Sequence, residues 1–424
     1  MKEYENISVA DGVEVICVPA TRFKTNETAI CFSLELNGKT ASCNSVLTHI
    51  LSGCSAEYPD LTLLNRKLAL LYGATLHRTV TKQAGNQIIT LSISSLDDRF
   101  AIGDEVISRE SLKLLLSLIF SPRVDENGYF FDEDIEREKR VVIQKLESEK
   151  SEKRIYALRR LEEEMFKGEP NAVNALGDID GIKNVTKQEL KTALDNLISN
   201  AKIQLITVGN GDSDYTAKTV KSFFDGVKRS YTGLKKPALV EKADKVNTVE
   251  ERRSVKQGKL VLGYRAGIES DDERTTAMRI FSDVFGGGPY SKLFMNVREK
   301  LSLCYYCSAR YVRSDSFISV QCGCEEENMD KAVNEIQAQL ESIRNGDFKE
   351  EFDASVKGTC DSVSSVYDES EILLSWYISQ ITDSKPLSPN EYIEKFRSVS
   401  YGEIQNAARL ISLDTVFKLT EAEK

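Results

Sequence analysis

The sequence contains very little histidine: only His49 and His77 occur among its 424 residues. Chemistry that needs several histidines, whether a metal site or a catalytic triad, is therefore disfavoured before any motif is sought. A run of about 18 apolar residues, long enough to span a membrane, is also missing. The net charge of −10 and the lack of a clustered basic stripe disfavour nucleic-acid partners.

The start of the chain also lacks a secretory signal. The stretch MKEYENISVADG has acidic residues and no apolar core. Nine cysteines, an odd number, without a secretion signal favour reduced thiols, so we expect a cytoplasmic protein with no membrane association. The composition, 41% hydrophobic and 29% charged, is typical of a globular protein, and the length suggests about two to four domains.

The first half of the chain predicts alternating strands and helices. Period-two alternation with β-branched residues predicts strands, and leucines at helical spacing predict helices. The turn QAGN joins two of these strands into a hairpin. The predicted strands are residues 13–20, 28–38, 74–82, 87–95 and 203–209, and the predicted helices are 44–52, 61–73, 98–120, 132–166, 186–198 and 215–227.

The second half repeats the order of the first. A strand at 258–267 is followed by helices at 273–286 and 291–303, a hairpin at 304–324 with its turn near Arg313–Ser316, and a helix at 328–346. This order predicts an α+β fold of two tandem homologous domains, each an antiparallel sheet with helices on one face. The expected domains are residues 1–228 and 257–424, joined by a lysine-rich, non-periodic surface linker at 229–256.

One stretch of the second half is a specific signature. In GGGPYSKLFMNVREKLSLCYY, a glycine run is followed by Leu-Phe, by Arg-Glu-Lys, and by a tyrosine seven residues after the arginine. With the YGA turn, the ERE-like helix and the VG strand in the same order, the chain resembles the pitrilysin-like zinc metallopeptidases, which include insulinases and mitochondrial processing peptidases. The resemblance covers nearly the whole chain and implies the same two-domain fold.

Active members of that family carry an inverted zinc motif, His-x-x-Glu-His. Its histidines lie one helical turn apart and share a metal, while the glutamate takes a proton from metal-bound water. Counting back from Gly53-Cys54, the three slots fall on Asn44, Leu47 and Thr48. The distal ligand slot falls on Lys145, whose ammonium would repel a dication, while Glu138 matches an acidic position that supports the site. We therefore expect no metal and no catalytic residue of its own in this helix.

The signature in the second half is intact. By resemblance, its arginine and tyrosine correspond to Arg298 and Tyr305, which in active relatives hold the substrate backbone and the reacting carbonyl. A guanidinium fork and a phenol are donors suited to that role. The alternative is structural: Arg298 pairs with a neighbouring acid and Tyr305 belongs to the core.

The two histidines and a cysteine cluster are weaker candidates. His49 has no partner histidine and is expected to be a surface or helix-flank residue, and His77 a strand residue. The pairs Cys304/Cys307 and Cys322/Cys324 permit a zinc or disulfide hypothesis, with Cys307 and Cys322 facing each other across the hairpin. Ordinary strand residues are favoured, because free cysteine is a common small hydrophobe.

Two glycine stretches could suggest phosphate binding. GNGDSD has Gly209 and Gly211 but lacks the third glycine of a dinucleotide loop, so a strand-to-helix turn capped by Asp212 or Ser213 is favoured. The glycine run Gly286–Gly288 is followed by Pro289, which has no backbone N–H to donate to a phosphate, so phosphate binding is disfavoured there too.

The resemblance implies a division of labour. In related two-subunit enzymes one chain carries zinc, the other carries the arginine and tyrosine, and the two close around a chamber. The first hypothesis is a non-catalytic subunit of a heterodimeric zinc peptidase, binding peptide and facing a zinc-bearing paralogue of similar length. The second is a catalytically silent peptide-binding or scaffold protein, possibly homodimeric and accessory to protein modification. A third, a zinc peptidase using the cysteines or His49, predicts about one zinc per chain.

Overall fold

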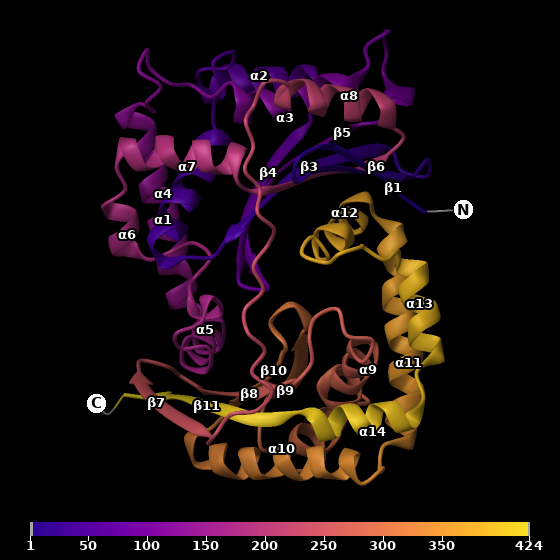
Figure 1. The fold of residues 1–424 in the computed structure, drawn as a ribbon. Helices are drawn as coiled ribbons and strands as arrows, with labels where there is room; N and C mark the ends of the chain where they lie inside the picture. The colour runs from indigo at the N-terminus through magenta and orange to yellow at the C-terminus, as the bar shows by residue number, and fades with distance from the viewer. Residues whose placement is uncertain (1–2, 423–424) are drawn as a thin grey trace. The chain divides into compact units, whose positions relative to one another are not determined.

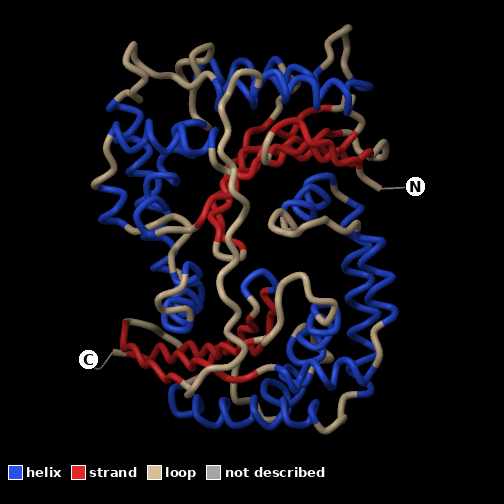
Figure 2. Tube along the Cα trace, viewed as in Figure 1, coloured by secondary structure: helices blue, strands red, loops and turns tan. Residues whose placement is uncertain are grey.

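The computed structural model describes residues 3–422 and divides into two compact units, each built on one β-sheet (Figures 1 and 2). The units are not sequential halves of the chain. Unit 1 comprises the chain up to Leu146 together with Val173–Lys236 and Val366–Ser388, and unit 2 comprises Glu147–Ala172, Pro237–Ser365 and the chain from Pro389 onward.

The sheet of unit 1 has six strands in the order β1-β2-β6-β3-β5-β4. The strands are β1 (Glu5–Ala10), β2 (Val13–Pro19), β3 (Thr25–Glu35), β4 (Thr75–Gln83), β5 (Asn86–Leu96) and β6 (Lys202–Gly209). All neighbours pair antiparallel except β2 and β6, which are parallel. The predicted hairpin is confirmed, and its two-residue turn places Ala84 and Gly85 at positive φ, as tight hairpin turns require.

Helices cover both faces of this sheet. They are α1 (Gly38–Leu51), α2 (Leu61–Leu70), α3 (Ile107–Phe120), α4 (Asp132–Ser151), α6 (Ile179–Lys183), α7 (Lys187–Ser199), α8 (Ser213–Phe224) and α12 (Ser370–Ile378). Alternate residues of β2 show the division: Val13 and Val15 face the core formed with α1, α3 and α7, whereas Ile16 and Val18 face α12. Figure 1 shows α3 and α8 on one side of the sheet and α12 on the other.

The sheet of unit 2 has five strands in the order β7-β11-β8-β10-β9. They are β7 (Asn247–Arg253), β8 (Gly258–Arg265), β9 (Tyr306–Val312), β10 (Phe317–Cys324) and β11 (Ser412–Glu421). Again one pair, β7 and β11, is parallel and the others are antiparallel. The helices of this unit are α5 (Lys153–Met165), α9 (Thr275–Gly286), α10 (Met329–Arg344), α11 (Lys349–Ser364), α13 (Pro389–Ser398), α14 (Tyr401–Leu410) and a π-helix, η3 (Leu293–Lys300).

The two sheets share one topology, which confirms the predicted α+β fold of two homologous domains. Strands β2-β6-β3-β5-β4 correspond in order and direction to β7-β11-β8-β10-β9, with β1 as an addition at one edge. The last helix before the returning strand starts in the same way in each half. In α7 and in α14 a capping box joins the first residue to the glutamate three positions later, Thr186 with Glu189 and Ser400 with Glu403.

Each unit receives one helix from the other half of the sequence. Helix α5 follows α4 in the first half, yet Leu161 packs with Val261 and Phe417 of the second sheet. Helix α12 comes from the second half, yet it covers the outer face of the first sheet. The helices of a half thus cover one face of its own sheet, as expected, and the exchanged helix covers the second face.

Several predicted elements are wrong in extent; the predicted helix 44–52, for example, begins at Gly38. The predicted helix 98–120 is a single 3-10 turn, Asp98–Phe100, followed by a loop and then α3, because Asp98 turns back to accept a hydrogen bond from the backbone N–H of Ser108 at 2.8 Å. The predicted helix 132–166 is two helices that separate at Glu152, whose carboxylate caps α5 by accepting from the N–H of Arg154. The end of the predicted linker 229–256 is strand β7, held by its ladder to β11.

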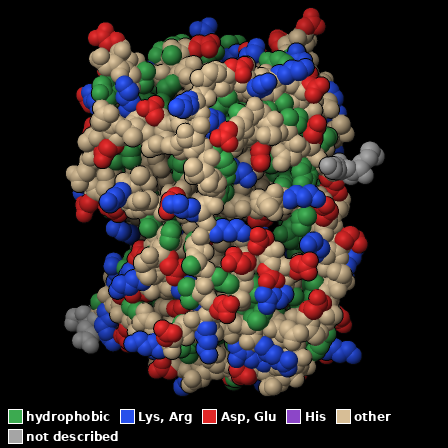
Figure 3. All heavy atoms as spheres, viewed as in Figure 1, with side chains coloured by type: hydrophobic (Ala, Val, Ile, Leu, Met, Phe, Trp, Pro, Cys, Tyr) green, Lys and Arg blue, Asp and Glu red, His purple; other side chains and the backbone are tan. Residues whose placement is uncertain are grey.

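The surface is mixed in charge on the face drawn in Figure 3, where lysine and arginine side chains are interspersed with aspartate and glutamate. None of the helices within residues 3–422 combines the length and the apolar character that crossing a membrane requires.

Candidate functional site

Helix α1 carries three of the four positions that correspond to the zinc ligands and the proton-accepting glutamate of active relatives. Asn37 begins the helix by accepting a hydrogen bond from the N–H of Lys39. Asn44, Leu47 and Thr48 are all buried, with exposed fractions of 4%, 0% and 1%. Leu47 belongs to the main apolar core of unit 1. The helix face that corresponds to the metal site is thus packed interior.

The polar atoms of this face are used within the unit. The Asn44 side-chain amide donates to Gln87 Oε1 at 2.8 Å, and the Gln87 amide donates in turn to the carbonyls of Ala41 and Ala175. The Thr48 hydroxyl donates to the Asn44 carbonyl one turn back at 2.7 Å. A threonine bonded in this way presents no anionic oxygen, and a neutral amide oxygen is a poor zinc ligand. The polar side chains on this face of α1 therefore have hydrogen-bond partners within the unit.

Lys145, in the distal slot, lies in a different environment. Its side chain is exposed on α4, whereas the three α1 positions are buried. The four slots therefore do not form one shared polar pocket in unit 1.

His49 is not a surface residue, which corrects the expectation from the sequence. It is 6% exposed, and its Nδ1 lies 3.5 Å from Glu138 Oε2 on α4. Burial alone would raise the pKa of Glu138, but the contacts with His49 and Arg137 outweigh it and lower the pKa. The sequence gave no signal that His49 is buried, because His49 belongs to no motif. The match of Glu138 to an acidic position that supports the metal site was the one available hint. His77, by contrast, is an exposed residue of β4, as predicted.

Arg298 lies on the π-helix η3 of unit 2, and a π-helix is uncommon outside functional regions. Its side chain is 41% exposed, stacks over the Phe294 ring at 4.6 Å, and lies 3.5 Å from Glu299. The pairing with a neighbouring acid, which the structural alternative predicted, is therefore present. It is a partly exposed contact, which contributes little energy and leaves the guanidinium accessible.

Tyr305 is not a core residue. It is 62% exposed, and its hydroxyl donates to Glu325 Oε1 at 3.1 Å. That hydrogen bond to a carboxylate raises the pKa of Tyr305, so the phenol remains a proton donor at neutral pH. Its backbone N–H donates to the Gly323 carbonyl at 2.8 Å, which fixes the start of β9. The pKa of Cys304, the residue before Tyr305, is lowered mainly by hydrogen bonds with Cys307 and Cys322 and further by the positive charge of Arg298.

The glycine stretches have structural roles. Asp212 caps α8 by accepting from the N–H of Tyr215, as predicted. At Gly286, a Cβ atom would lie 2.4 Å from the backbone nitrogen of Ala309. Glycine is therefore needed there so that the end of α9 can approach β9.

Comparison with known proteins agrees with this arrangement. A family model described as "Peptidase M16 inactive domain" matches residues 184–358. The "Probable inactive metalloprotease YmfF" of Bacillus subtilis (strain 168) is 28% identical over 417 residues, which cover 97% of this chain and 96% of that protein. The chain is thus a homologue of peptidase M16 proteins, and the resemblance to pitrilysin-like metallopeptidases is confirmed.

Solved structures extend the agreement to the whole fold of this M16 homologue. A conserved protein from Enterococcus faecalis V583 superimposes with a TM-score of 0.89 at 25% identity, with full coverage of both chains. A peptidase M16 inactive domain from Pseudomonas fluorescens has a TM-score of 0.79 at 17% identity, covering 99% of this chain and 98% of its own. At that identity the second likeness shows the fold alone.

Proposed function

We propose that this chain is the non-catalytic subunit of a heterodimeric zinc peptidase. It would bind peptide in a closed chamber and supply Arg298 and Tyr305 to the zinc site of a paralogous partner that contains His-x-x-Glu-His. The observation that carries the proposal is a contrast within the chain. The metal-binding positions on α1 are filled and buried, whereas Arg298 and Tyr305 remain exposed.

The chemistry of the two side chains supports the role. A guanidinium keeps its charge at neutral pH and binds carbonyl or carboxylate oxygens through a planar fork. The Tyr305 phenol is a neutral donor, and its present acceptor, Glu325, belongs to the same unit. A donor aimed at the oxygen that becomes negative in the transition state of peptide hydrolysis stabilises that state more than the ground state. Exchange of Glu325 for a substrate oxygen would place Tyr305 in this role.

The test is reconstitution with the zinc-bearing partner. The purified chain is mixed with a paralogue of similar length that contains the zinc motif, and mass and peptide hydrolysis are measured. Activity that appears only on mixing supports the proposal. Arg298→Ala should lower kcat/KM of the pair at least tenfold without changing assembly, because a charged donor is lost. Arg310→Ala, which removes an exposed arginine of β9, is the matched control.

Tyr305 allows a sharper version of the test. Tyr305→Phe removes one hydroxyl and should lower kcat more than it raises KM. Glu325→Gln weakens the competing acceptor, so it should preserve or raise activity. Unchanged turnover in both Arg298→Ala and Tyr305→Phe would remove these residues from the site and contradict the proposal.

A second candidate function is a catalytically silent peptide-binding or scaffold protein that forms a homodimer. It is favoured by the fact that both exposed donors already have acidic partners within the chain, Glu299 and Glu325. This function predicts peptide binding by the chain alone and no hydrolysis with any zinc-bearing paralogue. Equilibrium sedimentation and fluorescence polarisation with labelled peptides distinguish the two.

A further inference from the structure

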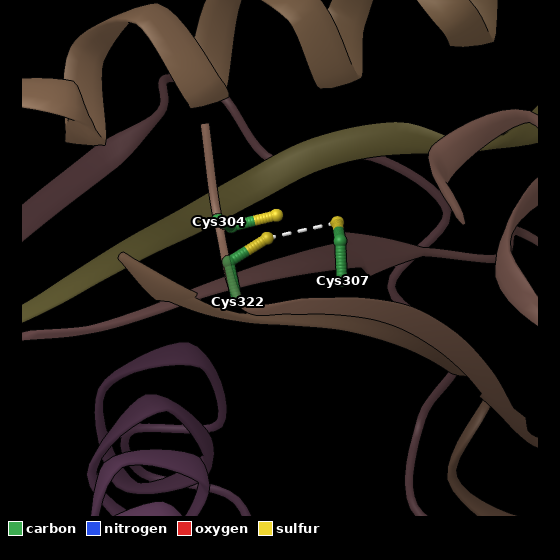
Figure 4. A group of neighbouring side chains, drawn as sticks. All are labelled: Cys304, Cys307 and Cys322. Carbon is green, nitrogen blue, oxygen red and sulfur yellow. Dashed lines mark hydrogen bonds between the residues drawn. The ribbon is translucent and has the colours of Figure 1, made fainter. Parts of the chain in front are cut away.

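Three cysteines of unit 2 converge within its sheet (Figure 4). Cys307 in β9 lies directly opposite Cys322 in β10, and Cys304 lies just before β9. The Cys322 thiol donates a hydrogen bond to Cys307 Sγ at 2.8 Å, and the three Sγ atoms all lie within 4.8 Å of one another. Figure 4 shows the sulfur atoms directed toward one another. The sequence predicted the facing of Cys307 and Cys322, whereas it brought Cys304 near them only in the disfavoured zinc hypothesis.

The cluster differs from cysteines that only fill a core. Cys31 is a buried thiol whose hydrogen bond comes from the hydroxyl of Thr90. Cys304, Cys307 and Cys322 are also buried, at most 7% exposed, but their sulfur atoms lie within 4.8 Å of one another. Thiol sulfur is a ligand that soft metal ions prefer.

The spacing of the sulfur atoms suits a shared metal ion. Three thiolates that bind one ion in a trigonal plane at about 2.3 Å are separated from one another by about 4.0 Å. The Cys307–Cys322 separation is 2.8 Å and the other two separations are at most 4.8 Å, so modest side-chain rotations would bring all three sulfurs to that spacing. We propose that Cys304, Cys307 and Cys322 form a three-thiolate binding site for a soft d10 metal ion, with Cu(I) as the ion that fits best.

The number and kind of ligands decide between soft ions. Structural zinc is almost always four-coordinate, whereas thiolates also select Cu(I). Within the described chain, no histidine, carboxylate or further cysteine joins the three sulfurs in the group. Buried thiolates without a fourth donor therefore favour Cu(I). Binding displaces thiol protons, so the affinity should rise with pH, and no oxidation or reduction is involved.

The site would constrain the segment that carries Tyr305. That residue lies between two of the ligands, Cys304 and Cys307, so a bound ion would fix the backbone on both sides of it. The inference goes beyond the proposed function and does not depend on it. Metal binding is a property of the isolated chain, whereas the peptidase role requires a partner.

The experiment titrates the reduced, metal-free chain with Cu(I) under nitrogen, in competition with a chromophoric Cu(I) chelator. One Cu(I) per chain is expected, with X-ray absorption showing a first shell of three sulfurs. Cys304→Ser, Cys307→Ser and Cys322→Ser should each weaken binding at least tenfold. Cys360→Ser, which changes a buried cysteine on α11, should leave the affinity unchanged. Thermal unfolding without metal checks that each variant is folded.

Three results would overturn the assignment. The first is a wild-type chain that binds no Cu(I) in reducing buffer, a result that does not depend on the folding of any variant. The second is a Cys324→Ser variant that loses as much affinity as the three ligand variants, because that outcome requires a fourth sulfur. Equal binding by wild type and all three ligand variants would place the ion elsewhere.

Discussion

The substitution Leu47→Glu tests whether the metal-binding face of α1 has become part of the core. In an active member of the family, a glutamate at this position faces metal-bound water. In this chain Leu47 is fully buried in the core of unit 1, so a carboxylate placed there would have neither water nor a cation to stabilise it. We expect the variant to be strongly destabilised rather than to become competent for metal binding.

The magnitude follows from two costs. Removing a buried leucine side chain forfeits about 1.5–3 kcal/mol of apolar burial. Burying an uncompensated carboxylate costs several kcal/mol more, or forces the carboxyl to stay protonated, at about 1.4 kcal/mol for each unit by which its pKa rises. The total is about 5 kcal/mol at neutral pH, comparable with the whole stability of many domains.

Urea unfolding at pH 7.5 and pH 5.0 measures the effect. A raised folded-state pKa makes the penalty absent below the unfolded pKa of about 4.3 and larger as pH rises, so the loss should be smaller at pH 5.0. Leu47→Gln, similar in size and uncharged, should lose stability equally at both values, and Leu47→Met should lose less than about 1.5 kcal/mol. A Leu47→Glu variant within about 1 kcal/mol of wild type at pH 7.5 would show that this face is open to water, and the reasoning would fail.

Three further predictions concern stability. Glu138→Gln should lower the unfolding free energy by about 1–3 kcal/mol at pH 7. Because the pKa of Glu138 is lowered in the folded state, the stabilisation by its carboxylate is present above the unfolded pKa and is lost on acidification. The unfolding free energy of the variant should therefore vary less between pH 6 and pH 3 than that of wild type. Arg265→Ala should cost about 3–5 kcal/mol in urea unfolding, because it leaves a buried acidic partner unpaired, and a loss below 1 kcal/mol would contradict this. Gly286→Ala should lower Tm, whereas Gly402→Ala, which meets no neighbour within 4 Å in α14, should raise it slightly; equal shifts would refute the packing argument.

Most strands were predictable from sequence because they alternate and are rich in β-branched residues, although β1, β7 and β11 were not predicted. The register of the hairpin in unit 2, with Cys307 facing Cys322, followed from locating one turn, since side chains alternate strictly along a strand. Strand β7 was missed because NTVEERR is highly charged and lies at a sheet edge, where it gains its place from pairing with β11 rather than from apolar residues. Local pattern cannot reveal a strand of that kind.

The exchange of helices between the two units could not be predicted from the sequence, for a different reason. Periodicity shows that α5 has an apolar face, but it does not show which sheet that face covers. The separation of α4 from α5 at Glu152 contains no proline or glycine, so the sequence carried no breaker there. Gly263 in β8 allows α5 to pack closely on this sheet. A Cβ atom on Gly263 would lie 2.6 Å from Met165 Sδ, so only glycine leaves room for this helix, which is distant in sequence.

The packing of the α1 positions shows how this fold accommodates residues other than zinc ligands in the corresponding slots. A zinc site organises its ligands by charge, and once the metal is gone three polar or ionic side chains would remain unsatisfied in an interior location. In this chain the amide of Asn44 bonds to Gln87, the hydroxyl of Thr48 bonds to its own helix, and Leu47 joins the core. Each of the three side chains is therefore stabilised in its buried position by its own contacts. Because each of these positions is packed or hydrogen-bonded on its own, introducing a single ligand residue would disturb the local packing without completing a metal site.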